Sequence, residues 1–369
     1  MTIDGLTVHI GDCRESMRRM PEQSVQTCVT SPPYFGLRDY GHDGQIGLEP
    51  TPDEFVTALV EVFREVRRVL RDDGTLWLNL GDSYINNPAS AVNRNGMSGS
   101  LNNGKTEFEC RTGTRGSQQR TTIPAGLKVK DLAGIPWRVA FALQADGWYL
   151  RQDIIWAKPN PMPESVRDRC TKAHEYIFLL TKSARYFYDA EAIKEQSASS
   201  DPSHQHYRAN GKSDSRKKHV AAVCSDCDGS GDGKDGEYGD PCKLCGGTGL
   251  PPKGGGFSES KAKPAFGNSG MKKFDGRNRR SVWTVSTKPY SGAHFATFPP
   301  DLIEPCILAG SKPGDVVLDP FGGSGTTAGV ALKHGRQAVL CELNPEYAAL
   351  IPDRVADVHP HLNQQRLFA

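Results

Sequence analysis

Apolar residues recur along much of the chain at the two spacings that distinguish strands from helices. Residues 25–30 form a short apolar run, which is typical of a buried strand. The next apolar positions follow a helical repeat: Phe55, Leu59, Val62, Phe63, Val66, Val69 and Leu70. Asp72-Asp73-Gly74 favours a turn, and residues 75–80 then predict another strand.

The same alternation returns in later segments. We predict a helix near residues 132–145 and strands at 150–156 and 176–181. Towards the end of the chain we predict a strand at 316–318, a helix from Thr326, a strand at 338–341 and a helix at 346–358. Strands that alternate with helices indicate an α/β fold of the Rossmann type, a parallel sheet with helices on both faces.

Two polar stretches lack this periodicity. Residues 83–125 are rich in Asn, Gly, Ser and Arg and predict a mobile loop. Residues 195–280 are rich in Gly, Ser and Lys and predict an irregular insert. The predicted organisation is therefore one domain in two halves, 1–194 and 281–369, with the insert between them.

Composition narrows the class of protein. The 369 residues include no apolar run long enough to span a membrane, and the first residues lack the pattern of a secretion signal. These features predict a cytoplasmic protein. The net charge is only +2, but residues 253–280 carry mostly basic charges, which suits a nucleic-acid partner as well as a solvated loop.

A glycine-rich turn follows the predicted strand at 316–318. It reads Asp319-Pro-Phe-Gly-Gly-Ser-Gly325 and leads into a helix, so its backbone can approach a ligand closely. Glu342 ends the next predicted strand, where a carboxylate can accept hydrogen bonds from both hydroxyls of a ribose. The pattern predicts an adenosine-containing cofactor, although the glycine spacing also fits a dinucleotide.

A second motif, Ser31-Pro32-Pro33-Tyr34, ends the first predicted strand. The Ser31 hydroxyl and the Pro32 carbonyl can both accept hydrogen bonds from one amino group. Tyr34 offers a ring on which a planar group can stack. A Pro-Pro pair alone more often marks a simple loop, but the cofactor motif beside it favours a catalytic interpretation.

Four of the ten cysteines form two CxxC pairs, Cys224 with Cys227 and Cys242 with Cys245, each followed by a glycine-spaced tail. This spacing predicts a closed tetrathiolate zinc site of structural type at residues 224–249. The repeated CxxCxGxG resembles the zinc modules of DnaJ-type chaperones.

Taken together, the motifs resemble the amino-DNA methyltransferases, which methylate cytosine N4 or adenine N6. The matching segments are Ser31–Tyr34, Asp319–Gly325, Glu342, Gly11-Asp12, Trp156-Ala157-Lys158-Pro159-Asn160 and His294–Pro299. The catalytic motif precedes the cofactor motif, which is the circularly permuted order of the beta class. The resemblance implies S-adenosylmethionine as cofactor, double-stranded DNA as substrate, and a cognate restriction endonuclease as partner.

The resemblance also implies roles for single residues. The expected catalytic residues are Ser31, Pro32, Pro33 and Tyr34. Asp12 is expected to accept a hydrogen bond from the adenine amine of the cofactor. The expected cofactor contacts are Asp12, His294, Phe298, Asp319, Phe321, Gly323, Gly325, Thr326, Glu342 and Asn344. The target base is expected to leave the duplex and stack on Tyr34.

The insert is predicted to recognise DNA, stiffened by its zinc module. Its expected DNA contacts are Lys261, Lys263, Lys272, Lys273, Arg277, Arg279 and Arg280. The resemblance implies cytosine N4 rather than adenine N6, because Ser-Pro-Pro-Tyr is commoner among the family's cytosine enzymes and Asp-Pro-Pro-Tyr among its adenine enzymes. Two rival functions are a non-catalytic zinc-bearing DNA-binding protein and a nicotinamide-dependent oxidoreductase.

Overall fold

The computed structural model describes residues 3–37, 41–42, 44–85, 123–195, 276–287 and 298–360. The residue contacts divide the chain into two units, residues 1–194 with 278–369, and residues 195–277. In the second unit, Glu195 and Arg277 form an isolated bridge and an ion pair. The second unit begins at the same residue as the predicted insert but ends at Arg277. Residues 278–280 group with the first unit.

In the described part of the first unit, eight strands form one sheet in the order β1-β8-β7-β2-β3-β5-β4-β6. Their bounds are β1 Leu6–Ile10, β2 Val25–Thr30, β3 Leu70–Leu80, β4 Tyr149–Ala157, β5 His174–Thr181, β6 Val282–Thr284, β7 Val316–Asp319 and β8 Gln337–Glu342. The five strands from β1 to β3 are parallel to one another. Their carboxyl ends therefore meet at one edge of the sheet.

The expectation of a wholly parallel sheet is wrong for one strand. β5 runs antiparallel to both β3 and β4. Residues 158–173 join β4 to β5 without a crossover helix, and neighbouring strands joined in this way must reverse direction. The sheet is therefore mixed, with its parallel part around β7 and β2.

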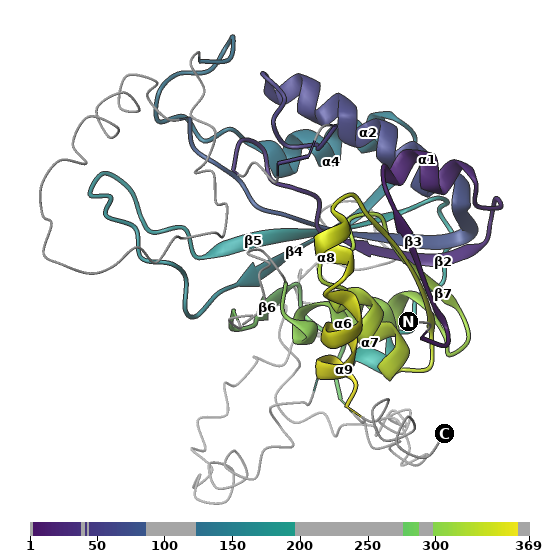
Figure 1. Ribbon diagram of the computed structural model, residues 1–369. Helices are drawn as coiled ribbons and strands as arrows, with labels where there is room; N and C mark the ends of the chain where they lie inside the picture. The colour runs from purple at the N-terminus through teal and green to yellow at the C-terminus, as the bar shows by residue number, and fades with distance from the viewer. Residues whose placement is uncertain are drawn as a thin grey trace, which may run out of the picture. The chain divides into compact units, whose positions relative to one another are not determined.

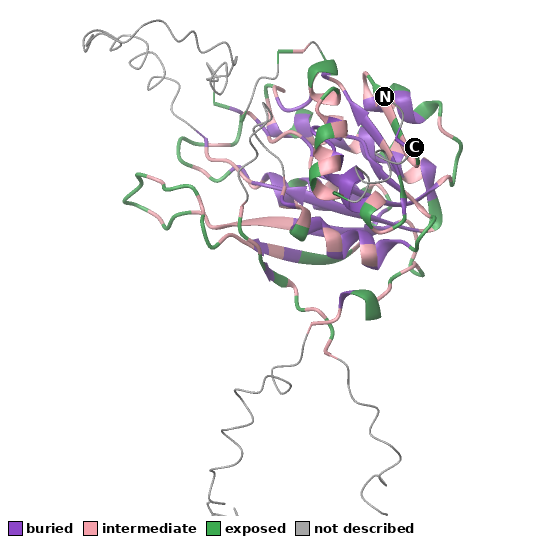
Figure 2. Ribbon diagram, turned by 60° about the horizontal axis from the view of Figure 1, so that its bottom comes forward, coloured by how far each residue is buried: buried purple, intermediate pink, exposed green. Residues whose placement is uncertain are grey.

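Helices cover both faces of the sheet, as the periodicity predicted (Figure 1). One face carries α1 Cys13–Arg18, α2 Pro52–Val69 and α4 Ile135–Ala145, and the other α6 Pro300–Gly310, α7 Thr326–Lys333 and α9 Ile351–Val358. Short α8 Pro345–Ala348 and the 3-10 turn η1 Glu191–Ile193 are the remaining elements of the described residues. Each face has its own apolar core, and Figure 2 shows the buried residues along the strands and the inward sides of the helices.

Three element boundaries differ from the sequence predictions. The predicted helix at 346–358 is two helices, because Pro352 in the first turn of α9 lacks the N–H that a continuous helix needs. β3 begins at Leu70, so the expected turn at 72–74 lies within the strand. The start of the expected mobile loop is also ordered, since Tyr84 forms a bridge with Leu132. Residues 86–122 lie outside the described part.

None of the helices in the described residues is long and apolar enough to cross a membrane.

Candidate active site

The predicted motifs converge at the carboxyl edge of the parallel strands. Ser31–Tyr34 follows β2, Asp319 ends β7 and Glu342 ends β8, and these three strands are neighbours in the sheet or one strand apart. The crevice at this edge is where open α/β sheets bind ligands. The sheet order therefore brings together motifs that are almost 300 residues apart in the chain.

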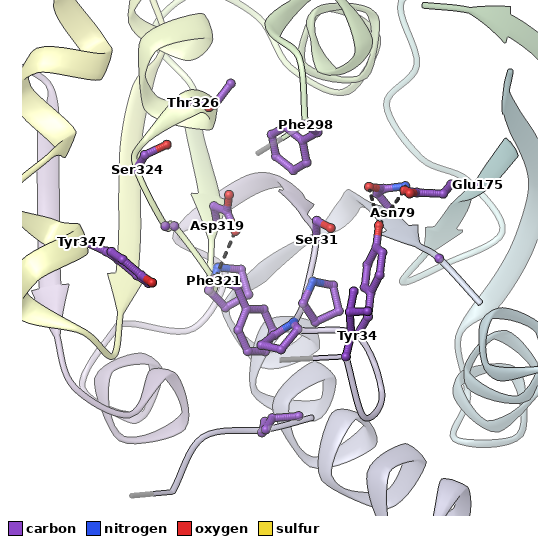
Figure 3. A pocket seen from close by; sticks show the side chains of 18 of the residues that line it. Ser31, Tyr34, Asn79, Glu175, Phe298, Asp319, Phe321, Ser324, Thr326 and Tyr347 are labelled. Carbon is purple, nitrogen blue, oxygen red and sulfur yellow. Dashed lines mark hydrogen bonds between the residues drawn. The ribbon is translucent and has the colours of Figure 1, made fainter. Parts of the chain in front are cut away.

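A cavity of about 950 Å³ lies at this edge. Most of the predicted catalytic and cofactor residues line it: Asp12, Ser31, Pro32, Pro33, Tyr34, Phe298, Asp319, Phe321, Gly323, Thr326, Glu342 and Asn344. Figure 3 shows Ser31 between two groups of side chains, Asp319, Phe321 and Tyr347 on one side and Tyr34, Asn79 and Glu175 on the other. The cavity therefore extends in two directions from Ser31 and has one end on each side of it.

The glycine turn needs its glycines for backbone shape and close packing. Gly325 has φ +95° at the start of α7, a conformation that favours glycine. A Cβ on Gly322 would lie 2.9 Å from Cβ of Leu340, so no side chain fits there. Gly325 itself is outside the cavity lining and shapes the turn rather than facing the cavity.

Glu342 holds the glycine turn from the next strand. Its carboxylate accepts from the backbone N–H of Gly323 at 2.7 Å and of Asn344 at 2.8 Å. Burial raises the pKa of this carboxyl. Each carboxylate has about four lone-pair positions, so Glu342 can accept further bonds from a ligand in the cavity.

Asp319 ties the two motifs together. Its carboxylate accepts from the hydroxyls of Thr30 and Thr327, both at 2.6 Å, and from the backbone N–H of Phe321 at 3.0 Å. Thr30 ends β2 and Thr327 lies in α7, so one side chain fixes the end of β2 against the glycine turn. Burial raises the pKa of Asp319 to about 6, although these three donors oppose the shift.

This raised pKa predicts a pH-dependent contribution to stability. In the folded chain Asp319 keeps its proton up to about pH 6, whereas its ordinary pKa is 3.8. The stabilisation is therefore full below about pH 4 and lost as the pH rises through 6. We compare the unfolding free energy of the wild type with that of Asp319→Asn. As the pH rises over this range, the wild-type value minus the variant value should fall by roughly 3 kcal/mol.

Denaturant titrations of both proteins at several pH values measure this difference. The Asn variant is the control because its side chain does not titrate. A difference that stays constant from pH 4 to pH 7 would show that the pKa of Asp319 is not raised in the folded chain.

Asp12 is already paired within the chain. Its carboxylate accepts from the backbone N–H of Arg14 at 2.7 Å and from the Arg14 guanidinium at 2.6 Å. The hydrogen bonds from the Arg14 side chain lower the pKa of Asp12. Asp12 therefore stays ionised at neutral pH and lines the cavity as an acceptor.

At the other end of the cavity, Tyr34 is held by its hydroxyl. The hydroxyl donates to Glu175 at 2.6 Å and lies 3.3 Å from the Asn79 side-chain oxygen. The ring packs closely against Gly81, where an added Cβ would lie 2.4 Å from a ring carbon. The ring is therefore fixed in orientation, and Tyr34 lines the cavity.

Glu175 is the centre of this arrangement. Besides Tyr34, it forms an ion pair with Lys158 and accepts from Asn79 at 3.3 Å. The Lys158 ammonium lies 4.2 Å from the centre of the Trp156 ring. Side chains from β3, β5 and the end of β4 thus support the tyrosine that follows β2.

The comparisons with known proteins agree with this geometry. A family model described as DNA methylase, of the N6/N4 type, matches residues 25–353. The chain belongs to this DNA methylase family. It is 43% identical over 355 residues to the type II methyltransferase M.Cfr9I of Citrobacter freundii, covering 96% of this chain and 89% of that relative.

Other relatives extend the likeness. The chain is 42% identical to the type II methyltransferase M.SmaI of Serratia marcescens over 94% of this chain and 89% of the relative. The solved structure of the cytosine-N4-specific PvuII DNA methyltransferase has a TM-score of 0.54. It covers 98% of this chain and 93% of its own at 18% identity, which shows a shared fold.

Several residues of this DNA methylase were missed at the sequence level. Asn79, Glu175 and Tyr347 line the cavity but belong to no predicted motif. Lys158 lies in the matching segment at 156–160, which carried no assigned role. The one available signal for Glu175 is its position next to a predicted strand, and that signal is weak until the pairing of β5 is known.

Three of the predicted DNA contacts, Arg277, Arg279 and Arg280, are among the described residues. Arg277 donates to Glu195 at 3.3 Å, and the Arg279 guanidinium lies 4.7 Å from the centre of the Trp283 ring. Arg279 and Arg280 belong to the same unit as the cavity of the methylase but are not among the residues that line it. The other predicted DNA contacts, Lys261, Lys263, Lys272 and Lys273, lie outside the described residues, as does the predicted cofactor contact His294.

The predicted zinc site is not shown by the structure. Its four expected ligands, Cys224, Cys227, Cys242 and Cys245, all lie outside the described residues. Within the described ranges, no group of three or more His, Cys, Asp or Glu side chains is placed to hold a metal ion. The zinc module therefore stays a prediction from the spacing of Cys224, Cys227, Cys242 and Cys245 alone.

Proposed function

We propose that this DNA methylase transfers a methyl group from S-adenosylmethionine to N4 of a cytosine flipped out of duplex DNA. The observation that supports this most is the continuous cavity that extends in two directions from Ser31. A cofactor at one end and a base at the other would bring donor and acceptor together in line. Adenine N6 is the second candidate, since the family includes both types.

The residues at the cofactor end fit such a molecule. Glu342 would accept from the ribose hydroxyls and Asp12 from the adenine amine, while Phe321 and Phe298 supply apolar surface. Among the described residues, the Ser324 hydroxyl is buried without a hydrogen-bond partner and lines the same cavity. A polar ligand group there would satisfy it, because a buried unpaired hydroxyl is unfavourable.

The residues at the base end would hold the target. When bound, the cofactor supplies a sulfonium-activated methyl group. Ser31 and the Pro32 carbonyl would accept the two amino protons and direct the nitrogen lone pair towards this methyl. The methylated nitrogen would then lose one proton to water, along the hydrogen bond that the Ser31 hydroxyl accepts. Tyr34 would stack on the base, and Glu175 acts as a positioning residue that holds its ring.

Ser31 favours cytosine over adenine. A hydroxyl can both accept and donate, whereas the carboxylate that could stand here only accepts. The hydroxyl can therefore take one amino proton and still adjust to the neighbouring cytosine ring. The preference is modest, since one hydrogen bond is worth about 1 kcal/mol.

Methylation-detecting sequencing tests the proposed activity and finds its site. DNA from a host that expresses the wild-type protein should carry one modified sequence motif, and DNA from a host that expresses Ser31→Ala should carry far less. Host DNA without any new modified motif would contradict the proposal.

We further propose that residues 195–280 form the target-recognition segment, with the predicted zinc module inside it. The thiolates of Cys224, Cys227, Cys242 and Cys245 would complete a tetrahedral zinc shell and leave no open position, so the metal would have a structural role. The basic residues at 261–280 remain the predicted DNA contacts. The permuted motif order and a cognate restriction endonuclease also stay predictions.

Metal analysis tests the zinc module. We expect one zinc ion per chain in the wild-type protein and less than about a tenth of that when Cys224→Ser is combined with Cys227→Ser, because the two remaining thiolates, Cys242 and Cys245, bind zinc weakly. The double variant should still bind S-adenosylhomocysteine but bind DNA poorly. Wild-type protein purified without chelators that contains no zinc would exclude the module.

A further inference from the structure

The side chain of Met162 stands at the rim of the cavity. It lines the cavity and is 85% exposed, more than any other large apolar side chain of the described residues. A single exposed apolar residue is ordinary on a protein surface. Met162 differs by its place, because its loop follows Trp156 and Lys158 at the base end of the cavity.

The backbone that carries Met162 is stiff. Pro159, Pro161 and Pro163 occupy alternate positions, and a residue that precedes a proline is confined to extended conformations. Proline therefore restricts the chain on both sides of Met162. Such a segment loses little conformational entropy when it contacts a partner.

Hydrogen bonds fix both ends of this proline-rich segment, residues 159–164. Asn160 exchanges two hydrogen bonds with the backbone of Thr287, at 3.1 and 3.0 Å. Glu164 accepts from the Arg169 guanidinium at 2.7 Å and from the Lys172 backbone N–H at 3.2 Å. Met162 is thus presented on a pinned, extended support rather than on a free loop tip.

We propose that Met162 enters the DNA base stack and fills the gap left by the flipped target base. This inference rests on the proposed function, since it needs a base that leaves the duplex. A flipped base leaves an apolar slot between its neighbours, and apolar side chains that enter base stacks stabilise distorted DNA. Methionine is unbranched and polarisable, so it fits a slot between two flat rings.

The test compares two unmethylated DNA duplexes. Both contain the sequence motif in which the protein methylates its target base. In the first, the target base is paired normally. In the second, it lies opposite an abasic position, so no base pair has to break. The single-turnover methylation rate is measured with wild type, Met162→Ala, Met162→Leu and the loop control Val166→Ala, which changes an exposed side chain outside the cavity lining.

We expect Met162→Ala to slow methylation about tenfold on the paired duplex and less than about threefold on the abasic one. Met162→Leu and Val166→Ala should stay within about threefold of wild type on both duplexes. Calorimetry with S-adenosylhomocysteine should give the same affinity for all four proteins.

Equal rate losses for Met162→Ala on the two duplexes, or no loss on either, would overturn the inference. Wild-type protein that methylates neither duplex would instead contradict the proposed function. The two failures are therefore distinguishable.

Discussion

Replacing Tyr34 by alanine is expected to lower kcat for DNA methylation about 100-fold, while the affinity for S-adenosylhomocysteine stays within about threefold. The ring lies at the end of the cavity away from Asp319 and Tyr347, so its loss should affect the base and not the cofactor. Both the stacking surface and the orientation of the base would be lost. Single-turnover kinetics and calorimetric titration measure the two quantities.

Tyr34→Phe is the matched control. It keeps the ring but removes the hydroxyl that donates to Glu175 at 2.6 Å. We expect a loss of about tenfold or less, because the ring that would stack on the base remains and only the hydrogen bond that orients it is lost. If Tyr34→Ala weakened cofactor binding as much as methylation, the assignment of this end of the cavity to the base would be wrong.

Replacing Glu342 by alanine should have the reverse effect. We expect S-adenosylhomocysteine to bind about 100-fold more weakly, because two hydrogen bonds to a charged acceptor are lost. The same change leaves the backbone N–H groups of Gly323 and Asn344 without their acceptor, so the glycine turn would also loosen. Saturating cofactor should restore part of the methylation rate.

Glu342→Gln is the comparison for this prediction. It keeps one acceptor oxygen and the size of the side chain, so its loss should lie between those of wild type and alanine. Calorimetry gives the three affinities directly. Alanine and wild-type proteins with the same affinity would show that the carboxylate only supports the turn.

The parallel centre of the fold could be predicted from the sequence. β2 has the predicted bounds, 25–30, and β7 and β8 agree within a residue at each end. Buried parallel strands are short apolar runs bounded by turns, so local patterning is sufficient to find them. The motifs at their carboxyl ends follow from chain order, and the cavity lining agrees for most of them.

The base end of the site could not be predicted in the same way. Glu175 reaches Tyr34 only because β5 pairs antiparallel with β3 and β4, and such pairing is non-local. The helix α6 was also missed, because Pro305 lies within it and because it is buried along much of its length, which leaves no clear amphipathic repeat.

The support of the glycine turn could not be predicted either. Glu342 was predicted as a ribose ligand, but its hydrogen bonds to the backbone of Gly323 and Asn344 depend on the folded turn.

The central claim concerns the base that receives the methyl group. Mass spectrometry of nucleosides from DNA methylated by the purified protein identifies that base directly, with Ser31→Ala as the control for background. We predict N4-methylcytosine in the wild-type reaction and almost none with the variant. N6-methyladenine as the only product would contradict the cytosine assignment, and the absence of any methylated amine would contradict the proposed reaction itself.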